Sequence, residues 1–200
     1  MKLSRLVPLG NVLWVLVLLG VLLGSLYIQF FIGEEPCRLC TWQRMTMFFI
    51  MAVLLINLRF GQSTLNYGLI ILFALFGSTV SIRQILSYIM PGNPGFGPAV
   101  FGLHTYTWAL LVFACSILAS AIILIIGIGE RENEIKIKPV FIKGLFGIAM
   151  ATTLTFSVAT FNQCGLDVCP AATEYFEVTP DAIKSLEDEC CPDPKKKQLQ

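Results

Sequence analysis

The chain has 200 residues, of which 56% are hydrophobic, and it carries a formal net charge of +1 at pH 7. A mean hydropathy of +0.74 is too high for an ordinary soluble domain. The nearly balanced charge gives no reason to expect a protein that binds nucleic acid. Composition alone therefore indicates a protein that lies in a membrane.

The first apolar stretch, residues 6–33, contains no charged residue. It is longer than a helix needs to cross a bilayer, which takes about 20 residues. It also exceeds the apolar part of a cleaved signal peptide, about 7–15 residues, and no small-x-small cleavage site closes it. We therefore expect a retained span over about residues 8–32.

Four further apolar stretches follow in chain order. The second stretch, residues 45–58, would reach only about 21 Å, which is short of a hydrocarbon core of about 30 Å, so its helix is expected to begin near Thr41. The expected spans are about 41–58, 66–90, 103–129 and 140–161. The sequence thus predicts an all-α integral membrane protein. It would have a four-helix transmembrane bundle in residues 1–130, a cytoplasmic loop at 131–139, a fifth transmembrane helix and a periplasmic tail at 162–200.

Basic residues near the ends of the spans predict the orientation, because cytoplasmic loops carry an excess of lysine and arginine. With the N-terminus inside, the inner side would carry Lys2, Arg5, Arg59, Arg131, Lys136, Lys138 and Lys143. The outer side would carry Arg38, Arg44 and Arg83. We therefore expect a cytoplasmic N-terminus and, after five spans, a C-terminus on the outside.

This orientation places most cysteines on the outside, where an oxidising compartment lets disulfides persist. These outer cysteines are Cys37, Cys40, Cys164, Cys169, Cys190 and Cys191. Cys115 falls within the fourth span and is expected to be a buried small apolar residue. The topology and the placement of the cysteines support each other.

A CxxC pair, Cys37-Arg-Leu-Cys40, follows the first span directly, and such a pair can cycle between dithiol and disulfide. The thiolate is the nucleophile in this exchange. A helix that begins near Thr41 would place Cys40 at its cap, where the helix dipole stabilises an anion. Arg44, four residues further on, shares the face of Cys40. An arginine inside the membrane boundary is a functional candidate by default.

The hydrocarbon beside this pair can hold a lipid-soluble electron acceptor. Arg44 can donate hydrogen bonds to a quinone carbonyl, and Trp42, whose ring suits the interface, can flank the quinone ring. His104, at the start of the fourth span, is either an interface residue or a proton donor at the same site. The predicted cofactor is therefore a quinone, either ubiquinone or menaquinone.

Other roles for the cysteines compete with this interpretation. A CxxC pair can be half of a zinc site, but the chain has one histidine and its other thiols lie on separate segments, so we expect no metal. In the tail, Cys164, Cys169 and the vicinal pair Cys190-Cys191 allow three pairings. These cysteines either form structural disulfides that stabilise the tail or relay electrons between a soluble partner and the CxxC pair.

Two motifs resemble the disulfide bond formation protein B (DsbB) family of membrane quinone reductases. The first is Pro36-Cys37-Arg-Leu-Cys40-Thr-Trp-Gln-Arg44, and the second is Gly102-Leu-His-Thr-Tyr-Thr-Trp108. The resemblance covers about residues 10–130 and implies a four-helix bundle in a bacterial inner membrane. It implies Cys40 as the quinone-proximal thiol, Cys37 as its partner in exchange and Arg44 as the quinone contact. The implied partner is a periplasmic DsbA-like thiol oxidase, which this protein would reoxidise.

The chain departs from the family in its outer loop. Better-known members carry a second cysteine pair between the third and fourth spans, whereas residues 91–102 contain no cysteine here. We hypothesise that the tail supplies this pair. The competing functions are a thiol relay that carries reducing equivalents outward, a vitamin K epoxide reductase-like protein and a non-enzymatic metal-binding or scaffold protein. The first needs cysteines in the inner half of the bilayer, and the second carries its CxxC on a late span.

Overall fold

The computed structural model describes residues 6–33, 37–89, 95, 99–127 and 139–164. Its helices are α1 (Leu6–Tyr27), α2 (Arg38–Phe60), α3 (Thr64–Ser87), α4 (Thr105–Ile125) and α5 (Pro139–Cys164), and a π-helical segment, η2 (Ile28–Ile32), continues α1. Five of these elements are long and apolar enough to cross a membrane. The prediction of an all-α membrane protein with five spans is therefore confirmed. Within the described ranges, the β structure is one short hairpin.

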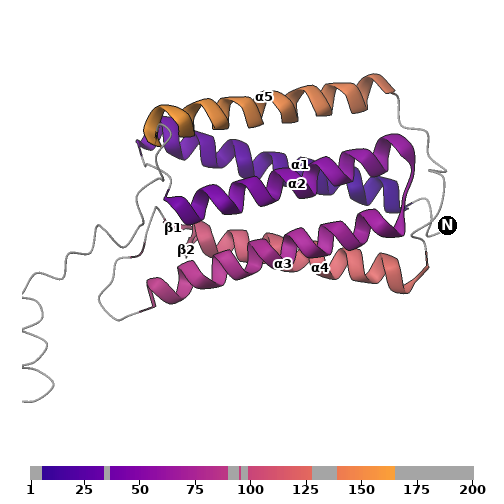
Figure 1. Ribbon diagram of the computed structural model, residues 1–200, viewed down its shortest axis with the longest axis horizontal. Coiled ribbons are helices and arrows are strands. Elements are labelled where there is room, and N and C mark those ends of the chain that lie inside the picture. The colour runs from indigo at the N-terminus through magenta and orange to yellow at the C-terminus, as the bar shows by residue number, and fades with distance from the viewer. Residues whose placement is uncertain (1–5, 34–36, 90–94, 96–98, 128–138, 165–200) are drawn as a thin grey trace, which may run out of the picture.

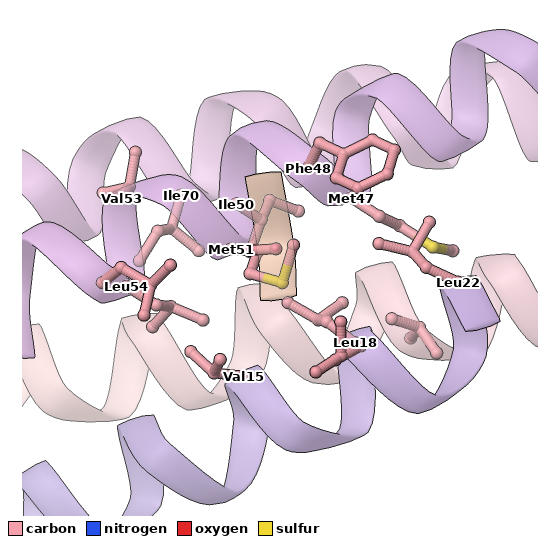
Figure 2. Packing of buried hydrophobic residues seen from close by; sticks show 14 of the residues in the cluster. Val15, Leu18, Leu22, Met47, Phe48, Ile50, Met51, Val53, Leu54 and Ile70 are labelled. Atoms are coloured by element: carbon pink, nitrogen blue, oxygen red, sulfur yellow. The ribbon is translucent and has the colours of Figure 1, made fainter. Parts of the chain in front are cut away.

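The helices lie side by side as a bundle (Figure 1). α2 packs between α1 and α3, α3 packs on α4, and α5 lies along α1 and α2. The interior between α1 and α2 is filled by aliphatic and thioether side chains, with Leu18 and Met51 among those labelled in Figure 2. In a membrane such packing, rather than exclusion from water, holds helices together. The bundle thus provides a rigid frame around the N-terminal end of α2.

The helix ends differ in detail from the predicted spans. α2 begins at Arg38 rather than near Thr41, because the carbonyl oxygen of Cys37 already accepts a hydrogen bond from the Thr41 N–H at 3.0 Å. α3 begins at Thr64 and ends at Ser87, short of the predicted residue 90. α4 ends at Ile125, short of the predicted residue 129, and Gly127 has a φ of 71°.

A short hairpin precedes α4 at the same end of the bundle as the start of α2. Strand β1 (Ala99–Val100) pairs antiparallel with β2 (Leu103–His104), with Val100 opposite Leu103. The turn residues Phe101 and Gly102 both have positive φ, 52° and 79°. A two-residue hairpin turn of this kind favours glycine or asparagine, so Phe101 holds a strained backbone. The Trp108 indole N–H donates to the Val100 carbonyl at 2.9 Å and ties the hairpin to α4.

The cysteine tail lies largely outside the described residues. The predictions for Cys169, Cys190 and Cys191 fall there, and so does the predicted cytoplasmic loop apart from Pro139. Cys164 is the last residue of α5, but its side chain is not among those described. The proposed pairings in the tail therefore stay predictions.

Candidate functional site

The CxxC pair caps the start of α2. Cys37 has an extended backbone, with φ of −70° and ψ of 163°, and its sulfur accepts a hydrogen bond from the Cys40 N–H at 3.2 Å. Both cysteines are free thiols, and their Sγ atoms lie 2.8 Å apart. A disulfide bond is about 2.05 Å long, so the pair can close without a change in the helix.

The helix cap is Cys37 and not Cys40, which corrects the sequence prediction. Because the helix begins one turn earlier than expected, Cys40 lies in its first turn. Cys37 is buried, with 5% of its surface exposed. The hydrogen bond with the Cys40 sulfur, followed by burial, raises the pKa of the Cys37 thiol. The contact with Cys40 and burial therefore both favour the neutral thiol at Cys37.

Gln84 of α3 contacts both sulfurs and is fully buried, with 0% exposure. Its Nε2 donates to Cys40 Sγ at 3.3 Å and to Cys37 Sγ at 3.5 Å. Its Oε1 accepts a hydrogen bond from Gln43 Nε2 at 3.0 Å. A glutamine from the neighbouring helix thus donates to both sulfurs, and its Oε1 also lies 3.9 Å from Cys40 Sγ.

Arg44 lies one turn after Cys40 and points toward α1. Its Nη1 donates to Gln29 Oε1 at 2.7 Å, and its Nη2 lies 3.5 Å from the Ser25 carbonyl oxygen. Gln29 belongs to η2, where the wider π-helical turn carries it as a buried side chain. Single π-helical turns are frequent at functional sites. A neutral glutamine is therefore a hydrogen-bond partner of this arginine.

The fifth helix also contributes to the arginine's surroundings. The Arg44 guanidinium carbon lies 4.9 Å from the centre of the Phe156 ring. Phe156 is buried and also contacts Phe48 of α2, with ring centres 6.2 Å apart. A cation over an aromatic face is attracted by the ring quadrupole. α5 is thus part of the site and not a separate anchor.

A cavity of about 590 Å³ opens beside Cys40, Gln43 and Arg44. Its walls come from α1, η2, α2, the hairpin and α4, and most of the side chains that line it are apolar. Trp108, Phe101 and Val100 form the side toward the hairpin. A mostly apolar pocket with a few convergent polar groups is the usual form of a small-molecule site.

Three predicted residues lie elsewhere than the sequence suggested. Trp42 is 52% exposed and packs edge-on against Phe76 of α3, outside the lining of this cavity. His104 stacks on Tyr106 with ring centres 5.3 Å apart, and it does not line the cavity either. Cys115 is exposed on α4 and not buried as expected, because it lies on the side of α4 that no other described helix covers.

Sequence reasoning assigned no role to five residues of the site: Gln29, Gln43, Gln84, Trp108 as a wall of the cavity, and Phe156. For the three glutamines a signal existed, because uncharged polar residues within apolar spans need an internal partner. They were not predicted because glutamine is neither ionisable nor redox-active. Phe156 gave no signal, since one phenylalanine among many in apolar stretches does not show which helix it will contact.

Comparison with known proteins supports the resemblance noted in the motifs. Residues 9–94 match the family model of the disulfide bond formation protein DsbB. Disulfide bond formation protein C of Bacillus subtilis (strain 168) is 32% identical over 90 residues, which are 45% of this chain and 64% of that relative. No solved structure gave a significant match. The DsbB-like segment contains the dithiol, Arg44 and all three glutamines of the site, whereas Trp108 and Phe156 lie beyond it.

Proposed function

We propose that the protein is a membrane thiol oxidase that passes electrons from Cys37 and Cys40 to a quinone dissolved in the bilayer. One observation carries the proposal: Cys40 and Arg44 line the same apolar cavity. The DsbB-like segment that holds the dithiol supports a role in disulfide bond formation.

The residues present fit a quinone. The cavity offers apolar walls to a ring and to the start of an isoprenoid tail, and its volume of about 590 Å³ lies in the range of small-molecule pockets. The guanidinium of Arg44 supplies hydrogen-bond donors for a carbonyl oxygen. On this geometry Trp108, rather than Trp42, would flank the ring, since Trp108 lines the cavity. Cys40 is the thiol nearest to such a ligand.

The chemistry of the proposal balances as a two-electron transfer. The quinone, when bound, accepts two electrons and two protons and becomes a quinol. On the protein, the two thiols lose two protons and two electrons and form the Cys37–Cys40 disulfide. Gln29 and Phe156 would hold the guanidinium of Arg44 in place. The apolar walls would exclude water from the sulfur of Cys40.

The proposed electron donor is a DsbA-like, thioredoxin-fold dithiol protein outside the cytoplasmic membrane. Its reduced pair would exchange with the Cys37–Cys40 disulfide, so that the partner's disulfide forms and the dithiol returns. The tail cysteines Cys164, Cys169, Cys190 and Cys191 would relay this exchange. Serine in place of each tail pair in turn tests the relay, which is wrong if neither double variant slows oxidation of the partner.

Quinone reduction by the purified full chain tests the proposed function. The protein in detergent is given a reduced thioredoxin-fold dithiol and a soluble quinone, and the loss of quinone absorbance is followed. Turnover is expected with the natural sequence and is expected to vanish in Cys40→Ser. Cys115→Ser is the matched control, because Cys115 lies on α4 away from the dithiol, and it should keep full turnover.

Two outcomes would contradict the proposal. If the natural protein formed disulfide in the partner without consuming quinone, the acceptor would be wrong. If the Cys37–Cys40 pair instead became reduced by a thiol from the cytoplasmic side and then reduced the partner, the protein would be the outward reductant relay. Equal turnover in Cys40→Ser and in the natural sequence would remove the dithiol from the mechanism.

A further inference from the structure

Gln84 is a buried amide at the end of the bundle where α2 begins. It is 0% exposed and lies near the end of α3, in the turn after Ser81. An amide that leaves water costs free energy unless its donors and acceptor are hydrogen-bonded. The hydrogen-bond partners of Gln84 therefore indicate its role.

The orientation of the Gln84 amide is set by Gln43. Gln43 Nε2 donates to Gln84 Oε1 at 3.0 Å, and this oxygen lies farther from Cys40 Sγ, at 3.9 Å, than Nε2 does. The Nε2 of Gln84 donates to both sulfurs, at 3.3 Å from Cys40 Sγ and 3.5 Å from Cys37 Sγ. Gln43 is itself buried and lines the cavity beside Cys40. The two glutamines thus connect the cavity wall to the dithiol.

We propose that Gln84 is a positioning residue that holds the two sulfurs together and stabilises the reduced dithiol against the disulfide. An amide N–H donates a stronger hydrogen bond to an anionic sulfur than to a neutral one. A disulfide sulfur is a weak acceptor, so closing the bond weakens both contacts. Gln84 therefore makes the Cys37–Cys40 disulfide a stronger oxidant of its partner.

This role rests on the proposed function for its biological meaning. The effect of Gln84 on the two sulfurs, however, does not depend on a bound quinone. The quantity that Gln84 sets is the equilibrium between the dithiol and the disulfide. That equilibrium can be measured against glutathione in the full chain. Failure of quinone reduction and failure of the Gln84 proposal are therefore separate results.

The test compares Gln84→Met with the natural protein in glutathione redox buffers. Both proteins carry serine at the tail cysteines and at Cys115. Methionine keeps the volume and removes both N–H donors, so the equilibrium should move toward the disulfide by about tenfold, as expected for a lost hydrogen bond of about 1.4 kcal/mol. At pH 7 the rate of alkylation of Cys40 by N-ethylmaleimide should also fall, because less thiolate is present.

Two further variants separate positioning from simple packing. Gln43→Met leaves Gln84 in place but removes the donor that orients it, and a smaller shift in the same direction is expected. This variant also carries the test if Gln84→Met does not fold. Ser81→Ala is the matched control, because Ser81 is equally buried on α3 but donates to the Gly77 carbonyl at 3.0 Å instead of to sulfur.

The proposal predicts no shift in the equilibrium for Ser81→Ala. An unchanged equilibrium and alkylation rate in both Gln84→Met and Gln43→Met would overturn it. The same shift in Ser81→Ala as in Gln84→Met would also overturn it, because the effect would then come from packing in α3.

Discussion

The guanidinium of Arg44 lies over the ring of Phe156, with the guanidinium carbon 4.9 Å from the ring centre. Arg44 belongs to the DsbB-like segment, whereas Phe156 belongs to α5, which lies outside it. A cation–π contact shielded from water is worth about 2 kcal/mol. The fifth helix therefore helps to fix the arginine that faces the cavity.

Replacing Phe156 by leucine should weaken quinone binding. Leucine keeps an apolar side chain but has no ring quadrupole, so the guanidinium of Arg44 becomes less well fixed. We expect the KM for quinone to rise by about three- to tenfold, with a smaller change in kcat. Steady-state kinetics over a range of quinone concentrations measures both.

Phe146→Leu is the control for this change, because Phe146 is an exposed phenylalanine on the same helix. It should leave the KM unchanged. An equal rise of KM in both variants would mean that α5 acts only through general packing.

Replacing Arg44 should affect the quinone step more strongly. Lysine keeps the charge but cannot reproduce a planar group that contacts Gln29 and the Ser25 carbonyl while a donor remains for a ligand. We expect Arg44→Lys to raise the KM for quinone by about tenfold or more, and Arg44→Met to raise it further. A KM for Arg44→Met that matches the natural protein would show that Arg44 serves packing alone.

Gly77 of α3 packs so closely against α4 that substitution by alanine should destabilise the fold. A Cβ atom there would meet the ring of Phe113, which is fully buried. Gly77→Ala is expected to lower the free energy of unfolding by about 1–3 kcal/mol, as overpacked cores do. Thermal unfolding in detergent measures the loss, and Gly68→Ala is the control because a Cβ at Gly68 meets nothing within 4 Å. Equal unfolding temperatures for Gly77→Ala and Gly68→Ala would contradict the close packing of Gly77 against Phe113.

The sequence predicted much of this molecule because its strongest signals are local. Long apolar stretches predicted the five helices, and the Cys37–Cys40 spacing with Arg44 one turn later predicted the reactive group. The hairpin was not predicted, because Phe101 adopts a backbone conformation that glycine or asparagine would normally mark. The contacts of Gln84 and Phe156 depend on which helices become neighbours, and that is decided by packing of the whole bundle rather than by local pattern.

The orientation predicted from basic residues can be tested at two exposed phenylalanines. Phe101, 94% exposed, lies in the hairpin beside the dithiol, and Phe60, 79% exposed, ends α2 at its other end. In a background without other cysteines, Phe101→Cys should react with a membrane-impermeant maleimide on intact spheroplasts. Phe60→Cys should react only after permeabilisation. The reverse pattern would place the dithiol on the cytoplasmic side.

The most direct measurement is a single turnover without any partner protein. The fully reduced chain, with its tail cysteines and Cys115 replaced by serine, is mixed with one equivalent of soluble quinone in the absence of oxygen. The account predicts one quinol per chain and one Cys37–Cys40 disulfide, identified by mass spectrometry of the non-reduced peptide. Quinone that stays oxidised while both thiols remain free would contradict the central claim.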